Sequence, residues 1–375
     1  MSLDADTIVV GAGIIGAACA HALAASGQQV LVLDDLRGGA TAAGMGHLVV
    51  MDDNAAELAL SSLSLRLWQQ WSAQLGKECA WHPCGTLWLA ASAEEMLAAE
   101  EKQARLQAQN VACTLVNAAR LQSMEPALRS GLHGALHVEH DAVVYAPNVA
   151  QWLLKGPTAL ARLKLRHAEV VAIEEPHVRL ADGSVLRAQA VVLANGLHAT
   201  GLCTDLPIRA KKGQLLITDR YPGTVHHQLV ELGYVTSAHH ATGPTVAFNV
   251  QPRPTGQLLI GSSREFDDTS RSLNFPMLEQ MLRRAVDYLP GLRDCNAIRC
   301  WTGVRAATPD GLPILGPHPT RPGLWLAVGH EGLGVTTAPA SAQILAAQMT
   351  GTACPIDPAP YRAQRFTQAS AHHAR

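Results

Sequence analysis

The sequence predicts an α/β fold in which a Rossmann-type domain is interleaved with an α+β domain built on a largely antiparallel sheet. Three observations support this prediction. Residues 6–34 read as one β–α–β unit, short strand-like runs separated by Pro and Gly fill the middle of the chain, and a glycine-rich segment followed by a long helix lies near its end. Glycine-rich turns that precede helices occur near both ends of the chain, around a β-rich middle. This arrangement indicates interleaved rather than sequential domains.

Length and composition are those of a folded protein with a large core. The chain has 375 residues, of which 48% are hydrophobic and 16% charged, with 29 basic and 31 acidic residues. This length exceeds the ~100–200 residues of one typical domain. The near-balanced charge argues against nucleic-acid binding. Eight cysteines without a CxxC pair favour free thiols, and His239-His240 lacks a third ligand at recognisable spacing, so no metal site is predicted.

Two stretches without charged residues, 7–33 and 332–356, exceed the ~18 residues that raise the question of a transmembrane helix. Glycines and glutamines interrupt the first stretch, and Pro339 with several polar residues interrupts the second. Both are interpreted as buried β–α elements. The sequence therefore predicts no transmembrane segment and a cytoplasmic protein.

The β–α–β unit begins with the apolar run 7–10, typical of a strand buried on both faces. A turn at 11–16 leads into a helix at 17–25, and a second strand at 30–33 ends at Asp34. In this context the GxGxxG glycines Gly11, Gly13 and Gly16 permit close approach of a pyrophosphate to a helix N-terminus, and Asp34 can accept hydrogen bonds from a ribose hydroxyl. A dinucleotide site is predicted; the acid disfavours NADP, and the unit alone leaves NAD and FAD open.

Apolar spacing predicts amphipathic helices at 57–75 and 94–110. A hairpin around Asp182-Gly183 leads into a buried strand at 190–194 and a break at Asn195-Gly196. Runs at 214–218, 245–250 and 257–261 predict an antiparallel sheet, followed by helices at 278–289 and about 337–349. The first domain is expected to comprise residues 1–84, 140–210 and 300–375, and the second residues 85–139 and 211–299.

Residues 300–349 (CWTGVRAATPDG…AAQM) resemble the D-amino acid oxidase superfamily of FAD-dependent oxidoreductases, in its glycine oxidase and sarcosine oxidase branch. The motifs TAAGMGHL (41–48), VVLANG (191–196), KKGQ (211–214) and LLIGSSRE (258–265) occur in that family's order. Residues 39–53 are similar to the β subunit of bacterial D-hydroxyproline dehydrogenases and, more loosely, to subunits of opine oxidase and hydrogen cyanide synthase.

The resemblance implies noncovalently bound FAD in the first domain. Small residues at 41–46 would lie against the pyrophosphate and the flavin edge, and the segment 329–334 would pass beside the flavin. The helix that follows would place its N-terminus, with roughly +0.5 charge, at the pyrimidine side of the ring. The residues expected at the cofactor are Gly11, Gly13, Ile14, Ile15, Gly16, Asp34, Asp35, Thr41, Ala42, Ala43, Gly44, Met45, Gly46, Val170, Asn195, Gly196, His330, Glu331, Gly332, Leu333, Gly334 and Val335.

The resemblance also implies a substrate site. Arg305 matches the family arginine that binds a substrate carboxylate, and its apolar neighbours suggest that it faces inward. Arg264, Asn249 and His47 are further candidates, although an exposed charge at Arg264 and a merely packed His47 are the alternatives. Asp52-Asp53 is interpreted as a solvated turn rather than an acid pair.

Asn249 replaces a tyrosine of glycine oxidases, and Gly332 replaces an arginine of some relatives, so a substrate larger than glycine is expected. The implied reaction is FAD-dependent oxidation of a small amino acid, such as D-hydroxyproline, to its imine by hydride transfer to flavin N5. The alternatives are a glycine- or sarcosine-type oxidase, an FAD-binding assembly or electron-relay subunit with partner subunits in a heteromeric dehydrogenase, and an NAD-dependent dehydrogenase.

Overall fold

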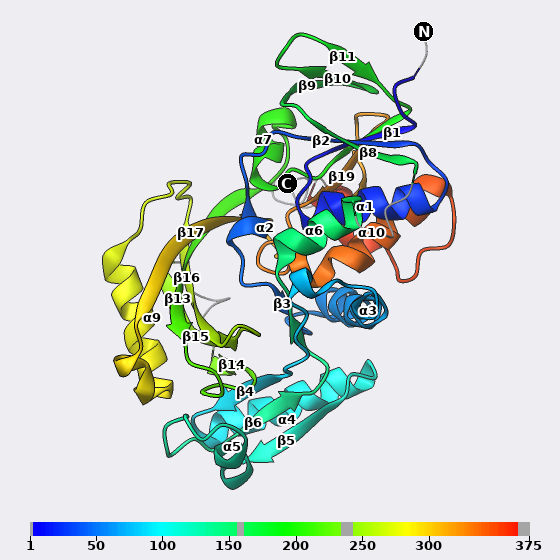
Figure 1. Cartoon of the computed structure of the whole chain (residues 1–375). Coiled ribbons are helices and arrows are strands. Elements are labelled where there is room, and N and C mark those ends of the chain that lie inside the picture. Colours follow the sequence, from blue (N-terminus) through cyan, green and yellow to red (C-terminus); the bar gives the residue numbers. More distant parts are fainter. Residues whose placement is uncertain (1–2, 156–160, 234–242, 367–375) are drawn as a thin grey trace, which may run out of the picture.

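The computed structural model describes residues 3–155, 161–233 and 243–366, and its sheets lie in two regions (Figure 1). In one region, six described strands form a sheet in the order β18-β19-β12-β1-β2-β8. All neighbours are parallel except β18 and β19. The strands are β1 (Thr7–Val10), β2 (Val30–Asp34), β8 (Leu163–His167), β12 (Ala190–Leu193), β18 (Ile314–Pro317) and β19 (Leu324–Val328).

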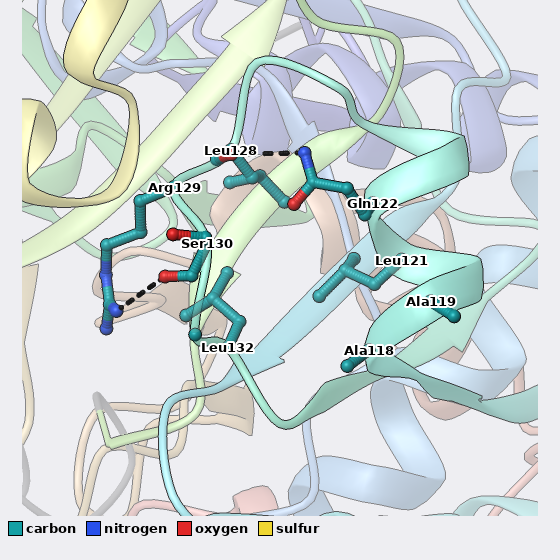
Figure 2. Close-up of a pocket in the computed structure, with 9 residues that line it drawn as sticks. Ala118, Ala119, Leu121, Gln122, Leu128, Arg129, Ser130 and Leu132 are labelled. Carbon is teal, nitrogen blue, oxygen red and sulfur yellow. Dashed lines mark hydrogen bonds between the residues drawn. The ribbon is translucent and has the colours of Figure 1, made fainter.

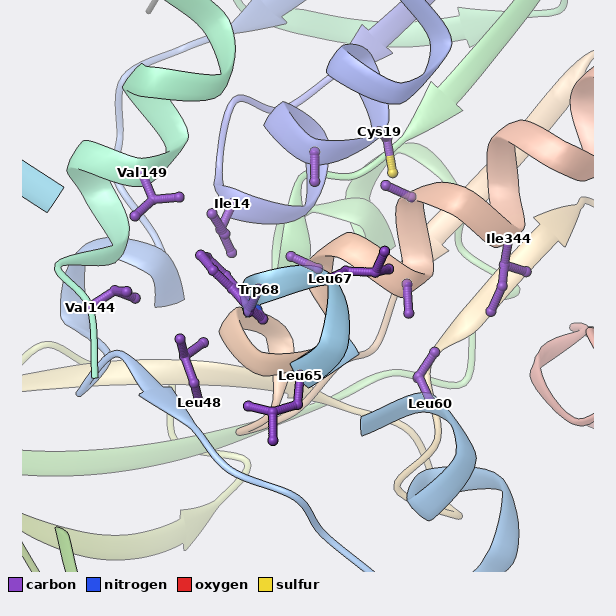
Figure 3. Close-up of a cluster of buried hydrophobic side chains, with 14 of the residues drawn as sticks. Ile14, Cys19, Leu48, Leu60, Leu65, Leu67, Trp68, Val144, Val149 and Ile344 are labelled. Carbon is purple, nitrogen blue, oxygen red and sulfur yellow. The ribbon is translucent and has the colours of Figure 1, made fainter. Parts of the chain in front are cut away.

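Helices from distant parts of the chain share a core beside this sheet. They are α1 (Ile14–Ala25), α3 (Ala55–Ser72), α6 (Ala146–Lys155) and α10 (Gly334–Thr350). Figure 3 shows Trp68 of α3 among side chains of α1 and neighbouring segments, and Trp68 is fully buried. Its Nε1 donates to the carbonyl oxygens of Val335 (3.2 Å) and Thr336 (2.9 Å). The indole thus fixes the first turn of α10 with one of the largest apolar side chains of the core.

The second region contains an eight-stranded sheet in the order β17-β13-β16-β15-β14-β4-β6-β5. It is antiparallel, as predicted, except that β14 and β4 are parallel. Helix α9 (Phe275–Tyr288) packs against β15 and β16, and α4 (Ala93–Ala108) and α5 (Ala118–Met124) lie at the β4-β6-β5 end (Figure 1). The strands are β4 (Thr86–Ala90), β5 (Cys113–Asn117), β6 (Gly134–Val138), β13 (Arg209–Arg220), β14 (Gln228–Glu231), β15 (Thr245–Pro252), β16 (Gln257–Phe266) and β17 (Ala297–Ala307).

Three smaller groups of strands and α-helices also belong to the described part of the chain. The predicted hairpin forms within a three-stranded sheet of β9 (Val170–Glu174), β10 (His177–Leu180) and β11 (Val185–Arg187). Strands β3 (His47–Leu48) and β7 (Ala142–Val143) pair with each other. Short helices α2 (Ala40–Ala43) and α7 (Ala199–Leu202) follow β2 and β12.

The structure confirms the predicted strands and helices but corrects several details. Helix α1 begins at Ile14 rather than at residue 17, and α10 begins at Gly334 rather than near 337. The solvated turn predicted at Asp52-Asp53 is wrong for Asp52, whose buried carboxylate pairs with Lys102 and accepts from Arg105 Nε at 2.7 Å. Strand β17 crosses the boundary predicted at residue 300, and the domain bounds stay a prediction.

Two other predictions concern the membrane and His239-His240. Among the described residues, no helix is both long and apolar enough to cross a membrane. The pair His239-His240 lies outside the residues that the structure describes.

Candidate functional site

The turn between β1 and α1 needs glycine at two positions. Gly11 has φ +104°, and a Cβ there would lie 2.8 Å from the carbonyl oxygen of Ala194. A Cβ at Gly16 would lie 1.9 Å from the carbonyl oxygen of Gly11. Gly13 caps α1 without a side-chain hydrogen bond, and Thr41 Oγ1 accepts from the N–H of Ile14 at 3.0 Å. This helix N-terminus, with its close backbone approach, has the geometry of an anion site.

Asp34 orders the same turn. Its Oδ2 accepts from the N–H of Ala12 at 2.6 Å and its Oδ1 from the N–H of Leu36 at 2.8 Å. Each carboxylate oxygen has a second lone pair available for a ribose hydroxyl. The predicted residue Val170 follows β8, whose last residue is the register partner of Asp34. Asp35 is exposed, and its Oδ1 accepts from the N–H of Arg37 at 3.0 Å.

Asn195 and Gly196 close the other side of the turn. The Oδ1 atom of Asn195 is buried and has no hydrogen-bond partner among the described residues. Gly196 has φ +61°, and nothing within 4 Å would meet a Cβ there. A buried acceptor of this kind is satisfied when a ligand brings a donor.

The segment 41–46 lies against strand β17. Trp301 Nε1 donates to the carbonyl oxygen of Ala43 at 2.9 Å, and a Cβ at Gly303 would lie 2.4 Å from the Cβ of Ala43. Gly46 has φ +77°, and a Cβ there would lie 2.0 Å from the carbonyl oxygen of Val144. The predicted residues Ala42, Gly44 and Met45 lie in this segment, which therefore joins the two large sheets.

The segment 330–335 leads into α10. His330 is buried, its Nε2 is 3.1 Å from Ser341 Oγ, and burial lowers the pKa of this histidine to about 3. The carboxylate of Glu331 accepts from Lys211 Nζ at 2.5 Å. Leu333 caps α10 without a side-chain bond, so the N–H groups of its first turn remain for a ligand.

Arg305 lies on the face of β17 that is turned toward Glu331. Its register partner on β13 is Lys211, and its Nη1 donates to the carbonyl oxygen of Ser263 on β16 at 3.2 Å. Burial alone would raise the pKa of Glu331. The positive charges of Lys211 and, with smaller effects, of Arg264 and Arg305 hold that pKa below its usual value. Three cations therefore surround one carboxylate, an electrostatic setting that suits a second anion.

Arg264 and Gly332 border this cluster. Arg264 is only 6% exposed, so the alternative of a surface charge is wrong. A Cβ at Gly332 would lie 3.8 Å from Arg305, which means that glycine leaves room beside the guanidinium.

His47 is the centre of a second polar cluster. Its Nδ1 is 2.9 Å from Gln228 Oε1, and its Nε2 is 3.2 Å from Asn249 Nδ2. Burial lowers its pKa to about 4; the hydrogen bond to Gln228 opposes this shift, and the charges of Arg305 and Arg253 add to it. The imidazole is therefore neutral at pH 7 and belongs to a hydrogen-bonded network rather than to apolar packing alone.

Sequence reasoning missed Lys211 in the first cluster and Gln228, Gln251 and Arg253 in the second. Gln251 Nε2 lies 2.9 Å from His47 Nδ1, and Arg253 Nη1 donates to the carbonyl oxygen of Met45 at 3.3 Å. A signal existed for one pair, because Asn249 and Gln251 are two residues apart on a strand and so share a face. Lys211 stood in the quoted KKGQ motif without an assigned role. For Gln228 the only sign is its complete burial, which the sequence does not reveal.

Two other features of the described residues lie apart from these clusters. Figure 2 shows a hollow between α5 and the loop 128–132, where Gln122 and Arg129 bond to nearby backbone carbonyls and no acid or histidine lines the wall. Cys203, Asp205 and His318 place one donor atom each within 4.8 Å of one another, but Arg321 also acts on Cys203 and disfavours a cation there.

Comparison with known proteins identifies this arrangement. The model of the family described as FAD dependent oxidoreductase matches residues 6–348. The chain belongs to this family. Glycine oxidase of Pseudomonas putida is 29% identical over 386 residues, covering 96% of this chain and 98% of the relative. An opine oxidase subunit of Rhizobium meliloti is 27% identical and covers 97% and 98%. The crystal structure of glycine oxidase from Geobacillus kaustophilus has a TM-score of 0.84 at 24% identity, covering 96% and 98%.

The residues described above fit FAD, the cofactor of the family. Three features suit the adenosine diphosphate part. They are the two glycines without room for a Cβ, the N-terminus of α1, which has no side-chain cap, and the buried acceptor atom of Asn195. The segment 41–46 and the start of α10 lie between the two sheets, where a flat apolar ring system would contact both. The protein is thus an FAD-dependent oxidoreductase with a glycine oxidase among its relatives along nearly the whole chain.

Proposed function

We propose that the protein oxidises the Cα–N bond of a small amino acid. The observation that carries this proposal is the position of the half-buried Arg305, whose guanidinium lies close to Gly213 and whose register partner on β13 is Lys211; Gly332 lies beside its side chain. A guanidinium offers a planar pair of N–H donors that matches a carboxylate. Bound FAD supplies the electron sink for a hydride.

In this proposal Arg305 binds the substrate carboxylate and so fixes the Cα–H bond relative to the flavin. The Cα–H bond breaks, its electron pair leaves with the hydrogen as hydride, and the nitrogen lone pair forms the C=N bond of the imine product. The reaction needs a neutral amine. The excess of positive charge from Lys211, Arg264 and Arg305 over Glu331 favours that form, because it disfavours an ammonium group nearby.

The finer proposal is a cyclic secondary amino acid, with D-hydroxyproline as the first candidate. It is supported by Asn249, which is smaller than the tyrosine of glycine oxidases, and by the space that Gly332 leaves beside Arg305. Glycine or sarcosine is the second candidate, favoured by the similarity to glycine oxidase of Pseudomonas putida along nearly the whole chain.

A second role, in which the protein binds FAD and relays electrons to partner subunits, is favoured by the similarity to the opine oxidase subunit of Rhizobium meliloti. The two roles differ in a simple test. A catalytic chain reduces its own flavin when it is purified alone, whereas a relay subunit does so only with its partners.

The experiment is anaerobic bleaching of the flavin absorption of the purified chain by glycine, sarcosine, both enantiomers of proline and all four stereoisomers of 4-hydroxyproline. We expect at least one of these amino acids to bleach the flavin, and a cyclic one to do so fastest. Absence of bleaching by every amino acid would contradict the proposed function.

A further inference from the structure

Asn249 carries a buried amide oxygen without a hydrogen-bond partner among the described residues. The side chain lies on β15 and is 7% exposed, and its other end, Nδ2, is 3.2 Å from His47 Nε2. Leaving a buried acceptor unpaired destabilises a fold, so such an atom calls for an explanation. A ligand that donates a hydrogen bond provides one.

The direction of this amide is set by a chain of hydrogen bonds that starts at a backbone carbonyl. Gln228 is fully buried and donates from Nε2 to the carbonyl oxygen of Ala142 at 3.0 Å and to Thr86 Oγ1 at 3.2 Å. Since a carbonyl oxygen only accepts, this end of the glutamine amide must be its NH₂ group. Gln228 Oε1 is then the atom that faces His47 Nδ1, at 2.9 Å. Gln251 Nε2 lies 2.9 Å from the same nitrogen and donates to Gln228 Oε1 at 3.3 Å. An imidazole proton on Nδ1 would share Gln228 Oε1 with Gln251.

The tautomer of His47 in turn decides the orientation of Asn249. A neutral imidazole protonated at Nδ1 can only accept at Nε2, which matches the NH₂ group of Asn249 that faces the ring at 3.2 Å. The Oδ1 atom of Asn249 therefore points away from the imidazole.

Asn249 lies near two other parts of the site, the segment 41–46 and the residues around Arg305. It is the register partner of Gly261 on β16, where a Cβ would lie 2.9 Å from Met45 Sδ. Two residues further along β16, the carbonyl of Ser263 accepts from Arg305. Asn249 thus lies beside the segment 41–46 and one strand away from the residue that Arg305 contacts.

We propose that Asn249 Oδ1 accepts a hydrogen bond from the amine N–H of the amino-acid substrate, and that Gln228 and His47 are positioning residues that hold this oxygen in place. The inference rests on the proposed function. A carboxamide suits a neutral amine, because it accepts one N–H without the negative charge that would favour an ammonium ion. Arg305 and Asn249 would then fix the two ends of the substrate's carboxylate–Cα–nitrogen unit.

The test compares each amino acid with an analogue in which oxygen replaces the NH group. Sarcosine is paired with methoxyacetate, and proline with tetrahydrofuran-2-carboxylate. The proteins are the full-length, FAD-loaded wild type, Asn249→Leu and Asn249→Ser. Binding of the oxygen analogues is measured from the change in the flavin spectrum, and binding of the amino acids from the saturation of anaerobic flavin reduction.

We expect Asn249→Leu to weaken amino-acid binding by roughly 3- to 15-fold, the effect of one lost hydrogen bond, and to slow flavin reduction further. Binding of the oxygen analogues, which carry the carboxylate but no N–H donor, should change less than about twofold. Asn249→Ser, which shortens the side chain, should show the same pattern and guards against a folding defect in the first variant.

The positioning step has a spectroscopic test of its own. In ¹⁵N NMR of histidine-labelled holoprotein at pH 7, with His47→Gln for assignment, we expect His47 to be protonated at Nδ1 and unprotonated at Nε2. The opposite tautomer would overturn the hydrogen-bond chain. Equal loss of amino acids and oxygen analogues in Asn249→Leu, or no loss of either, would overturn the role of Asn249 while wild-type flavin reduction still supports the proposed function. If no amino acid reduces the wild-type flavin, both proposals fail.

Discussion

The guanidinium of Arg305 covers Gly213 of the neighbouring strand. A Cβ at residue 213 would lie 2.7 Å from both Nη1 and Nη2 of Arg305 and 2.8 Å from the carbonyl oxygen of Ser263. These distances are shorter than any side chain tolerates. The observed position of Arg305 therefore requires glycine at position 213. This explains the glycine of the KKGQ motif, which leaves space for the guanidinium.

Gly213→Ala should displace Arg305 without removing it. We expect kcat/KM for the amino-acid substrate to fall on the order of 100-fold, because a shift of about 1 Å in a binding group is enough for such a loss. FAD content should stay normal. Gly291→Ala is the matched control, since nothing lies within 4 Å of a Cβ there. Unchanged kinetics in Gly213→Ala would show that the position of Arg305 does not matter for turnover.

FAD should be bound without a covalent link. We propose that the glycine turn, the N-termini of α1 and α10 and the segment 41–46 bind the cofactor through backbone groups and packing. Precipitation of the purified protein with acid should therefore release the yellow colour into the supernatant. Colour that remains in the pellet after washing would establish a covalent flavin.

The pKa of His47, lowered to about 4, makes the fold sensitive to acid. The unfolded histidine titrates near 6.5, so below that pH the unfolded state binds a proton more readily than the folded state. The contribution to stability is complete above pH 6.5 and is lost as the pH falls toward 4. Between pH 7 and pH 5 this loss amounts to at most roughly 2 kcal/mol in the free energy of unfolding.

Urea unfolding of wild type and His47→Gln at the two pH values measures this effect. The wild type should lose more stability than the variant on going from pH 7 to pH 5, although His330, whose pKa is lowered to about 3, contributes in both proteins. Identical pH dependence of the two proteins would mean that His47 is not held neutral in the fold.

The sequence predicted the parts of the fold and site that follow local rules. The glycines of the first turn and Asp34 stand at fixed spacings, and the alternation and punctuation of the middle strands are local patterns. Arg305 was found through a resemblance, because an arginine in a strand has no signature of its own.

The remainder depends on which distant segments the fold brings together. The ion pair of Lys211 with Glu331 joins residues 120 positions apart, and Gln228 lies 181 positions from His47. No local pattern encodes such pairs. Asp52 was misread for the same reason, since its partner Lys102 comes from a helix 50 residues away.

Removal of the Arg305 guanidinium should cripple turnover and leave the cofactor bound. Losing one partner of a desolvated charge pair costs on the order of 2–5 kcal/mol, which corresponds to roughly 30- to several-thousand-fold in kcat/KM. Arg305→Lys should be only partly active, because an ammonium restores the charge without the planar fork. A surface arginine would instead change the free energy by no more than about 0.5 kcal/mol.

The most direct test of the account is the preference for an amino acid over the amine that lacks its carboxylate. The ratio of kcat/KM for proline to that for pyrrolidine, or for sarcosine to that for dimethylamine, is measured by anaerobic flavin reduction in wild type and in Arg305→Ala. The account predicts a large ratio in the wild type that collapses in the variant, with FAD content equal in both. A ratio that is the same in both proteins would remove Arg305 from the substrate site and contradict the account.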